Sequence, residues 1–340
     1  MLASKAKIID LAGYLPEKIL SNEDLEILYP DWPKEKIYSK TGITKRHIAS
    51  QDETASDLAF QAAKKLFERG CVKPSEIDFL ILCTQTPDYI LPTTACILQD
   101  RLGLPRNIGA IDMNLGCSGF VYALSIAKGL IETNAAKKIL LITSDTYSKF
   151  IHPLDKSVRT IFGDGAVATL VENSDSNYDM IGPFIFGTDG SGADNLIIKS
   201  GLCRKEKNSD SSKEIEDLFG NIRSSENLYM NGPEIMNFSL TEVPLAFENI
   251  LRKSKLNRDD INYFVFHQAN KFMLESLRKK ININEKKFPI FIDDKGNTVS
   301  SSIPFALIGL KEKNLLRPGI TIMLVGFGVG YSWAATIVKF

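Results

Sequence analysis

Short apolar runs of strand length recur along the chain and alternate with segments in which apolar residues return every three or four positions. Four of these runs lie at 79–82, 139–142, 263–266 and 322–325. A short, uniformly apolar run is typical of a strand buried on both faces, and its alternation with helices is typical of α/β layering. We therefore expect an α/β protein whose strands lie inside the core.

The pattern of the first half of the chain recurs in the second half. Three pairs of segments are similar, in the same order and at nearly the same offset: 75–82 with 258–266, 117–124 with 300–307, and 139–144 with 320–325. A repeat that keeps both order and spacing is typical of a duplicated structural unit. We therefore predict two related α/β halves, residues 1–175 and residues 176–340.

The segment 320–338 contains no charged residue and has about the length of a membrane-spanning helix. Gly326, Gly328 and Gly330 lie in its middle, however, with β-branched residues on both sides. This composition favours two buried strands joined by a tight turn, so we expect no membrane span. The spaced glycines also suggest a dinucleotide-binding loop, but too few residues follow to form the helix that such a loop requires.

Composition limits the classes of partner. The chain has 340 residues, and its 41 Lys and Arg balance its 41 Asp and Glu, so no overall field attracts nucleic acid or an acidic membrane. Five cysteines without a CxxC pair argue against a disulfide framework and a metal site, and for a reducing cytoplasm. The polar segment 200–227 is expected to be a mobile, solvated loop or, less simply, a cover over part of a substrate entrance.

Cys117 lies where a strand-like segment, 109–113, gives way to a helix-like one, within the sequence GCSGF. Unpaired backbone N–H groups at a helix N-terminus favour the thiolate, which is the reactive form of cysteine. The small neighbouring residues leave room for a substrate carbonyl. A lone cysteine is also commonly an inert, buried side chain, so its position at this strand-to-helix elbow leaves both interpretations open.

Two further polar residues lie in positions that suit chemistry. His267 opens the sequence HQAN directly after the apolar run 263–266, and functional groups of α/β proteins commonly lie at the carboxyl ends of buried strands. Asn297 lies in the turn DKGNT, just before SSSIP. The alternatives are a core histidine and ordinary turn chemistry for the asparagine.

These segments together carry a family resemblance. GCSGF, HQAN and GNTVSSSIP, in this order and at these separations, resemble the active-site sequences of the β-ketoacyl-acyl-carrier-protein synthase III family, and KTGITKR, FGDGA and GFGVGYSW are similar to it as well. The resemblance implies the thiolase fold, five αβαβα layers built from two duplicated halves, which agrees with the internal repeat. It also implies an acyltransferase of fatty acid biosynthesis that needs no cofactor or metal.

The resemblance implies a decarboxylating Claisen condensation. Cys117 would receive an acyl group from an acyl-coenzyme A or acyl-carrier-protein thioester. Malonyl-acyl-carrier-protein would then lose CO2 while neutral His267 and Asn297 donate hydrogen bonds to its thioester oxygen, and the carbanion would attack the acyl-cysteine. Backbone N–H groups of Cys117 and Val329 would stabilise the second oxyanion, and Asn270 would orient the histidine and a bound water.

Some binding positions depart from the family. Where well-studied bacterial members hold the nucleotide of coenzyme A with an aromatic residue and two arginines, this chain has Lys36, Lys40 and Lys156. Lysine binds phosphate as a point charge, but it neither stacks on adenine nor forms a bidentate contact. We therefore expect coenzyme A, bound in part by Lys40 and Lys156, to be a weaker donor, with an acyl-carrier-protein donor as the alternative.

Two expectations concern protein partners. Arg278, Lys279 and Lys280, on the helix after HQAN, are similar to the basic patch on which the family docks the carrier protein, although Phe272 replaces a further arginine. A solvated basic helix face is the alternative explanation. Leu91 matches a position where acetyl-specific members place a phenylalanine that closes the acyl pocket of the partner subunit. We therefore expect a homodimer and an acyl group that is branched or longer than acetyl.

Other functions use similar residues. A papain-like hydrolase has Cys, His and Asn in this chain order, but its cysteine-rich context and elbow sequence are absent. A thiolase-fold acyltransferase, or a condensing enzyme of specialised metabolism with a different acceptor, stays open as the alternative function. A catalytically silent partner subunit is disfavoured because Cys117, His267 and Asn297 are all retained.

Overall fold

Five strands form the first sheet of the computed structural model, which describes residues 5–174 and 178–340. In spatial order they are β1 (Lys5–Tyr14), β7 (Gly165–Ser174), β6 (Lys138–Asp145), β4 (Phe79–Cys83) and β5 (Gly109–Met113). β4 runs parallel to β5 and β6, whereas β7 runs antiparallel to β6 and β1. The residues of β6 after Lys138 are all buried, and this cover on both faces explains the uniformly apolar run at 139–142.

A second sheet of four strands repeats this arrangement. Its order is β13 (Tyr263–Phe266), β14 (Thr321–Gly328), β15 (Ser332–Lys339) and β8 (Ile181–Thr188). β13 and β14 are parallel, and β15 is antiparallel to β14 and β8, which is the pattern of β4, β6, β7 and β1. The four predicted runs are all strands, and the internal repeat is confirmed. The expected boundary at residue 175 lies outside the described residues.

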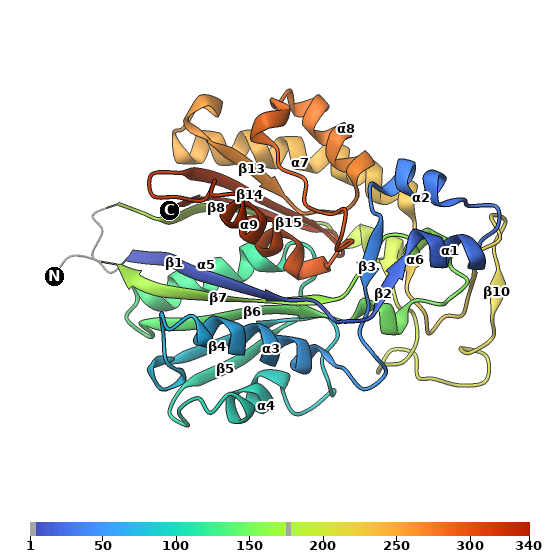
Figure 1. The fold of residues 1–340 in the computed structure, drawn as a ribbon, viewed down its shortest axis with the longest axis horizontal. Coiled ribbons are helices and arrows are strands. Elements are labelled where there is room, and N and C mark those ends of the chain that lie inside the picture. The colour runs from blue at the N-terminus through green and yellow to red at the C-terminus, as the bar shows by residue number, and fades with distance from the viewer. Residues whose placement is uncertain (1–4, 175–177) are drawn as a thin grey trace.

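Helices occupy three layers, outside and between the sheets (Figure 1). α5 (Gly119–Glu132) and α9 (Ser302–Glu312) lie between the sheets and contact strands of both. α3 (Ala55–Glu68) and α4 (Thr94–Arg101) cover the outer face of the first sheet, and α7 (Gly232–Ser254), with α8 (Lys271–Ile281) against it, covers that of the second. The layers therefore follow the expected order of helix, sheet, helix, sheet, helix.

The two central helices begin beside the residues that the sequence singles out. α5 starts two residues after Cys117, and α9 starts five residues after Asn297. α9 is buried from Ser302 to Leu310 because both sheets pack on it, so its sequence shows no polar face. This placement brings the N-terminal ends of α5 and α9 into the interior of the molecule.

The remaining elements gather largely at one end of the layers, where α1, α2, α6 and β10 lie in Figure 1. They are β2 (Ile19–Ser21), α1 (Asn22–Leu28), α2 (Lys34–Thr41), β3 (Lys45–His47), α6 (Lys156–Arg159), β9 (Leu196–Ile197), β10 (Ile215–Glu216), β11 (Ile222–Arg223) and β12 (Tyr229–Met230). Short 3-10 helices at 74–76, 147–150, 190–195, 258–260, 285–287 and 299–301 complete the chain.

The segment 200–227 belongs to this end. It is exposed along much of its length, as expected, but its second half is attached to α6. Arg223 Nε donates to a carboxylate oxygen of the buried Asp155 at 2.5 Å, and its Nη2 donates to Asp217 at 2.8 Å. The N–H of Ile222 donates to the carbonyl of Leu154 at 3.2 Å. These contacts place the tip of the segment beside the first residues of α6.

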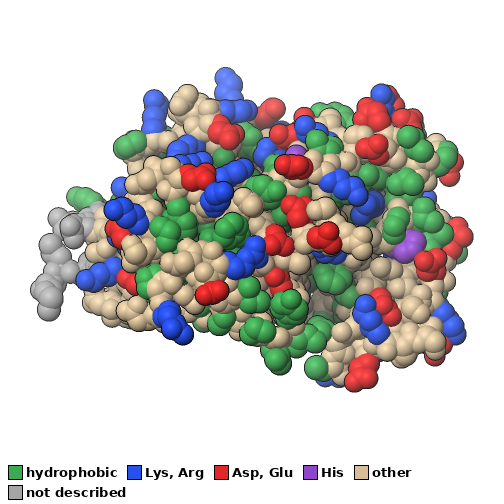
Figure 2. Space-filling model, turned by 60° about the horizontal axis from the view of Figure 1, so that its bottom comes forward, with side chains coloured by type: hydrophobic (Ala, Val, Ile, Leu, Met, Phe, Trp, Pro, Cys, Tyr) green, Lys and Arg blue, Asp and Glu red, His purple; other side chains and the backbone are tan. Residues whose placement is uncertain are grey.

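The surface agrees with the balanced composition, because the face in Figure 2 carries charged side chains of both signs intermixed. The uncharged segment 320–338 forms β14 and β15, as predicted. Within the described ranges, no helix is long and apolar enough to cross a membrane. The same part of the chain contains no group of three or more His, Cys, Asp or Glu side chains that could hold a metal ion.

Candidate active site

Cys117 lies in the elbow between β5 and α5. The N–H of Gly119 donates to the carbonyl of Gly116 at 2.8 Å, which closes a tight turn around the cysteine. The residue is only 5% exposed. Backbone N–H groups of Val329 and of Cys117 itself face its sulfur. The side chain is therefore held at the inner end of a turn, with two donors directed at it.

Burial decides the acidity of this thiol. Burial first, and the carboxylate of Asp145 second, raise the pKa of Cys117 to about 12, although the two backbone N–H groups act in the opposite direction. The expected preference for the thiolate is therefore wrong, because the desolvation of a negative charge outweighs the helix N-terminus here. Cys117 is a neutral thiol that must release its proton when it attacks.

β14 passes directly over the elbow because two of its residues are glycines. A Cβ atom at Gly326 would lie 2.7 Å from the Cα of Ser118, and one at Gly328 would lie 2.9 Å from the sulfur of Cys117. The hydroxyls of Ser118 and Ser332 hydrogen-bond at 2.7 Å and join the elbow to β15. Close packing against the cysteine thus explains these glycines, and a dinucleotide site is not needed.

His267 directly follows β13 and extends its ladder, since its N–H donates to the carbonyl of Val325 at 2.8 Å. The residue is 2% exposed, and its ring meets Phe327 edge to face with centroids 5.6 Å apart. Burial lowers the pKa of His267 to about 3. The imidazole is therefore neutral at physiological pH, as the resemblance implies.

A serine hydroxyl determines which ring nitrogen carries the hydrogen. Nδ1 of His267 lies 2.6 Å from Oγ of Ser302, and that oxygen also accepts the N–H of Gln268 at 3.3 Å. Among the described residues the Ser302 hydroxyl has no other acceptor, so donation to Nδ1 satisfies this buried hydroxyl. The hydrogen of the ring then lies on Nε2, which faces the cavity.

The turn before α9 fixes the amide of Asn297. Oδ1 accepts the N–H of Val299 at 2.9 Å, so the NH2 group points toward His267, with 3.5 Å between Nδ2 and Nε2. Gly296 and Val299 have φ angles of +73° and +53°, and the latter is an outlier for a β-branched residue. Strain of this kind at a polar, buried turn is typical of a functional site.

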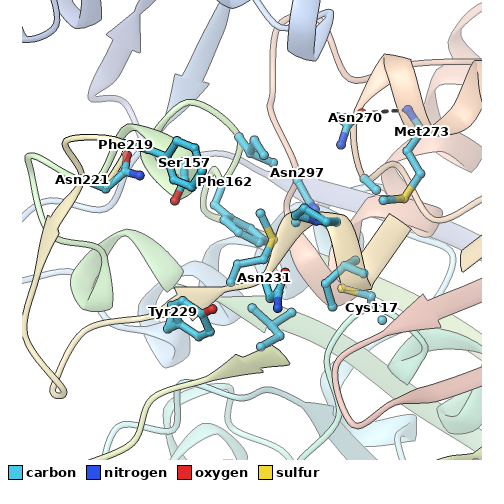
Figure 3. Close-up of a pocket in the computed structure, with 18 of the residues that line it drawn as sticks. Cys117, Ser157, Phe162, Phe219, Asn221, Tyr229, Asn231, Asn270, Met273 and Asn297 are labelled. Carbon is cyan, nitrogen blue, oxygen red and sulfur yellow. Dashed lines mark hydrogen bonds between the residues drawn. The ribbon is translucent and has the colours of Figure 1, made fainter. Parts of the chain in front are cut away.

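Cys117, His267 and Asn297 line one cavity of about 450 Å³. In the view of Figure 3, Cys117 lies at one end and Phe219 and Asn221 at the other, with Asn297 between them. The three predicted residues come from segments 150 and 30 positions apart and are brought together by the two central helices and β13. Two nitrogen donors and one thiol therefore face a common buried space.

Comparison with known proteins agrees with this geometry. Residues 111–190 match the family model described as 3-oxoacyl-[acyl-carrier-protein] synthase III, and residues 251–340 match that of its C-terminal part. A β-ketoacyl-[acyl-carrier-protein] synthase III of Clostridium tetani is 39% identical over 339 residues, which cover 100% of this chain and 99% of the relative. The chain belongs to the β-ketoacyl-acyl-carrier-protein synthase III family.

Solved structures of the family have the same fold. One 3-oxoacyl-(acyl-carrier-protein) synthase III is 58% identical with a TM-score of 0.98, covering 99% of this chain and all of that one. A 3-oxoacyl-(acyl-carrier protein) synthase from Burkholderia xenovorans LB400 is 37% identical with a TM-score of 0.90, covering 98% and 94%. The five layers described above are therefore the thiolase fold of this family.

Asn270 lines the cavity but makes a different contact from the one that the family resemblance implies. Its Oδ1 accepts the N–H of Met273 at 2.8 Å and caps α8. No hydrogen bond joins its side chain to His267 among the described residues. The hydroxyl that contacts the ring is that of Ser302, which the sequence analysis did not single out.

The lysines expected at the nucleotide do not line the cavity. Lys40 is exposed on α2 and Lys156 is half-buried at the start of α6. Aromatic residues line the cavity instead, among them Trp32 before α2 and Phe219 in the segment 200–227. Neither residue was predicted from the sequence. The family resemblance placed the aromatic residue at Lys36, four positions after Trp32. Phe219 lies in a polar segment, where no aromatic contact was expected.

The residues expected at protein partners all lie away from the cavity. Leu91 is 79% exposed and does not line it. Lys279 and Lys280 are exposed near the C-terminal end of α8. Arg278 is only partly exposed, because its guanidinium pairs with Glu275 at 2.7 Å. None of these four residues lines the cavity.

Proposed function

We propose that this chain condenses an acyl thioester with malonyl-acyl-carrier-protein to give 3-oxoacyl-acyl-carrier-protein and CO2, through an acyl-Cys117 intermediate. The observation that carries the proposal is the convergence of Cys117 with the nitrogens of His267 and Asn297 on one buried cavity. Full-length identity to the family supports the same reaction. Residues 1–175 would supply the nucleophile, and residues 176–340 the two donors.

In the first step the sulfur of Cys117 attacks the carbonyl carbon of the donor thioester. The bond from that carbon to the donor sulfur breaks, and the proton released by Cys117 ends on the departing thiol. The oxyanion of the tetrahedral intermediate would accept hydrogen bonds from the N–H groups of Cys117 and Val329, which already face the sulfur. Loss of one such donor costs about 10²–10³-fold in rate in comparable sites.

In the second step the malonyl thioester oxygen would lie between Nε2 of His267 and Nδ2 of Asn297. With the ring hydrogen on Nε2, both nitrogens are donors, and at 3.5 Å from each other they could donate to one oxygen that lies between them. As CO2 leaves, negative charge develops on that oxygen, where fixed donors in a dry site stabilise it most. The carbanion attacks the acyl carbon, and the released sulfur of Cys117 takes up the proton that the reaction consumes.

The end of the cavity at Phe219 would admit a donor with a long, thin arm. Trp32 and Phe219 line the cavity, and Ser157 at the start of α6 lies near Phe219 and Asn221 (Figure 3). Lys40 and Lys156 lie on the adjoining helices and would meet phosphate as point charges. The phosphopantetheine arm is common to coenzyme A and the carrier protein, so both remain donors in this proposal.

Docking of the acidic carrier protein is proposed along α8. The N-terminal residues Asn270 and Met273 line the cavity, and the exposed Lys279 and Lys280 follow two turns later on the same helix. A carrier protein that binds these charges would lie within reach of the entrance. Arg278 contributes less than the resemblance implies, because Glu275 already neutralises it.

A homodimer is proposed from the edge of the first sheet. β5 is an edge strand with an exposed Ile111, and the neighbouring segment exposes Tyr89, Ile90 and Leu91. An edge strand beside an apolar patch is typical of a surface that another chain covers. A second copy at this edge would bring Leu91 toward the partner's acyl site, where a side chain smaller than phenylalanine would admit a longer or branched acyl group.

Intact-mass spectrometry tests the proposed function. Wild-type protein incubated with a panel of acyl-coenzyme A and acyl-carrier-protein donors is expected to gain one acyl mass. Cys117→Ala is expected to gain none, whereas Cys96→Ala, which removes an exposed cysteine, is expected to react like wild type. Acylation of the Cys117→Ala protein would overturn the assignment of the nucleophile.

A further inference from the structure

A second cavity, of about 260 Å³, adjoins the cavity that contains Cys117. Leu196 lines both cavities, and Val329, whose N–H faces the sulfur of Cys117, lines the second one. An acyl group on Cys117 therefore has this space in which to extend. Six of its lining residues have apolar side chains: Phe150, Leu196, Ile197, Ile198, Leu228 and Val329.

Two amide side chains interrupt this apolar wall, those of Gln85 and Asn114. Oε1 of Gln85 accepts a short hydrogen bond from the hydroxyl of Tyr147, which fixes the orientation of the amide. Within residues 5–174 and 178–340, Nε2 of the half-buried Gln85 has no hydrogen-bond partner, whereas Asn114 is exposed to solvent. The third polar residue, Thr86, is engaged, since its hydroxyl accepts the N–H of Thr146 at 2.9 Å.

The amide of Gln85 lies directly beside the elbow. A Cβ atom at Gly116 would lie 2.4 Å from Oε1 of Gln85, so only glycine at this position allows the amide to pack here. Gly116 immediately precedes Cys117, and consecutive Cα atoms are about 3.8 Å apart. An acyl chain bound to Cys117 would therefore pass Gln85 with its first carbons rather than with its far end.

We propose that the acyl group transferred to Cys117 carries a hydroxyl or carbonyl oxygen on one of its first carbons, and that Nε2 of Gln85 donates a hydrogen bond to this oxygen. The inference rests on the proposed function and adds a class of donor to it. A plain alkyl chain would displace water from Nε2 and leave a donor without a partner, which is costly. A site built to hydrogen-bond a substrate oxygen discriminates against the analogue that lacks it.

Matched donors test this proposal. The initial rate of the acyl mass gain on Cys117 is measured with 3-hydroxybutyryl, 4-hydroxybutyryl and butyryl thioesters, each on coenzyme A and on the carrier protein. At least one hydroxylated donor is expected to react faster than butyryl by on the order of tenfold, which corresponds to one well-made hydrogen bond. Equal rates, or a faster reaction of butyryl, would overturn the inference and leave the proposed function intact.

Two variants show whether Gln85 is responsible. Gln85→Met keeps the length of the side chain without the donor, and it is expected to abolish the preference while butyryl transfer becomes faster. Tyr147→Phe removes the hydroxyl that orients the amide but keeps Nε2, and it is expected to weaken the preference without abolishing it. A preference that persists in Gln85→Met would overturn the assignment to Gln85, and absence of an adduct from every donor would overturn both proposals.

Discussion

At the scale of single residues, burial sets the protonation of the reacting groups. It raises the pKa of Cys117 to about 12 and lowers that of His267 to about 3, so both side chains are neutral near pH 7. A neutral imidazole with its hydrogen on Nε2 is a donor, and the condensation requires a donor at this position. The hydroxyl of Ser302 is the group that selects this tautomer.

Removal of the Ser302 hydroxyl is therefore expected to slow the second step selectively. In Ser302→Ala no hydroxyl donates to Nδ1 of His267, so the ring hydrogen can move from Nε2 to Nδ1. The turnover number with malonyl-acyl-carrier-protein is expected to fall by about 10–100-fold with little change in KM, while the acylation of Cys117 by intact mass stays near wild type. Ser301→Ala is the matched control, because Ser301 is equally buried but bonds to Thr143 and the carbonyl of Gly165. Equal loss in both variants would contradict the positioning role.

The depressed pKa of His267 has a consequence for stability. The unfolded histidine binds a proton below about pH 6.5, whereas the folded one stays neutral to about pH 3, so acidification through this range favours the unfolded chain. Between pH 7 and pH 5, wild type is expected to lose about 2 kcal/mol of unfolding free energy relative to His267→Gln. Urea denaturation at the two pH values measures this difference.

The pKa of Asp145 is raised to about 7, so acidification through this range stabilises the folded state at Asp145. Wild type and His267→Gln both contain Asp145, so its contribution cancels in their difference. A difference between wild type and His267→Gln that does not change from pH 7 to pH 5 would show that His267 titrates normally in the folded state. It would then be charged in mildly acidic solution, contrary to the role assigned to it.

At the scale of elements, β14 and the elbow can approach each other only because of glycine. Gly328→Ala would place a Cβ atom 2.9 Å from the sulfur of Cys117, so acylation is expected to fall by at least tenfold although the protein folds. Circular dichroism and intact-mass kinetics separate the two effects. Gly129→Ala in α5, where a Cβ meets nothing within 4 Å, is the control and is expected to add about 0.5–1 kcal/mol of stability. Wild-type acylation of Gly328→Ala would contradict the close approach.

The sequence predicts strands correctly where the burial of the strand is uniform. The runs at 79–82, 139–142, 263–266 and 322–325 are strands because both of their faces are covered, and this leaves a local pattern in the sequence. Cys117, His267 and Asn297 could be singled out for a related reason, since each lies next to a buried element within a short characteristic sequence.

Some residues that line the two cavities could not be predicted in this way. Trp32, Phe219 and Gln85 come from separate segments whose meeting depends on how the chain crosses one end of the layers, and no local pattern records it. The acidity of Cys117 was predicted with the wrong sign, because the helix N-terminus is a local feature whereas desolvation depends on everything that packs around the thiol.

At the scale of the whole molecule, the uncovered edge of the first sheet predicts association. The chain of 37.8 kDa is expected to sediment as a species of about twice that mass. Ile111→Lys places a charge on the edge strand β5 and is expected to yield monomers, whereas Ile27→Lys, on the exposed face of α1, is the control and is expected to leave the dimer intact. Monomeric wild type in analytical ultracentrifugation would contradict the proposed dimer.

In the proposed reaction the acyl group on Cys117 becomes part of a new carbon–carbon bond. A single-turnover experiment with isolated acyl-enzyme and malonyl-acyl-carrier-protein, without free donor, tests it most directly. We expect that the acyl mass leaves Cys117 as one 3-oxoacyl-acyl-carrier-protein and one CO2 form per site, and that His267→Ala and Asn297→Ala retain the acyl group. Release of the acyl group as a free acid, with malonyl-acyl-carrier-protein unchanged, would contradict it.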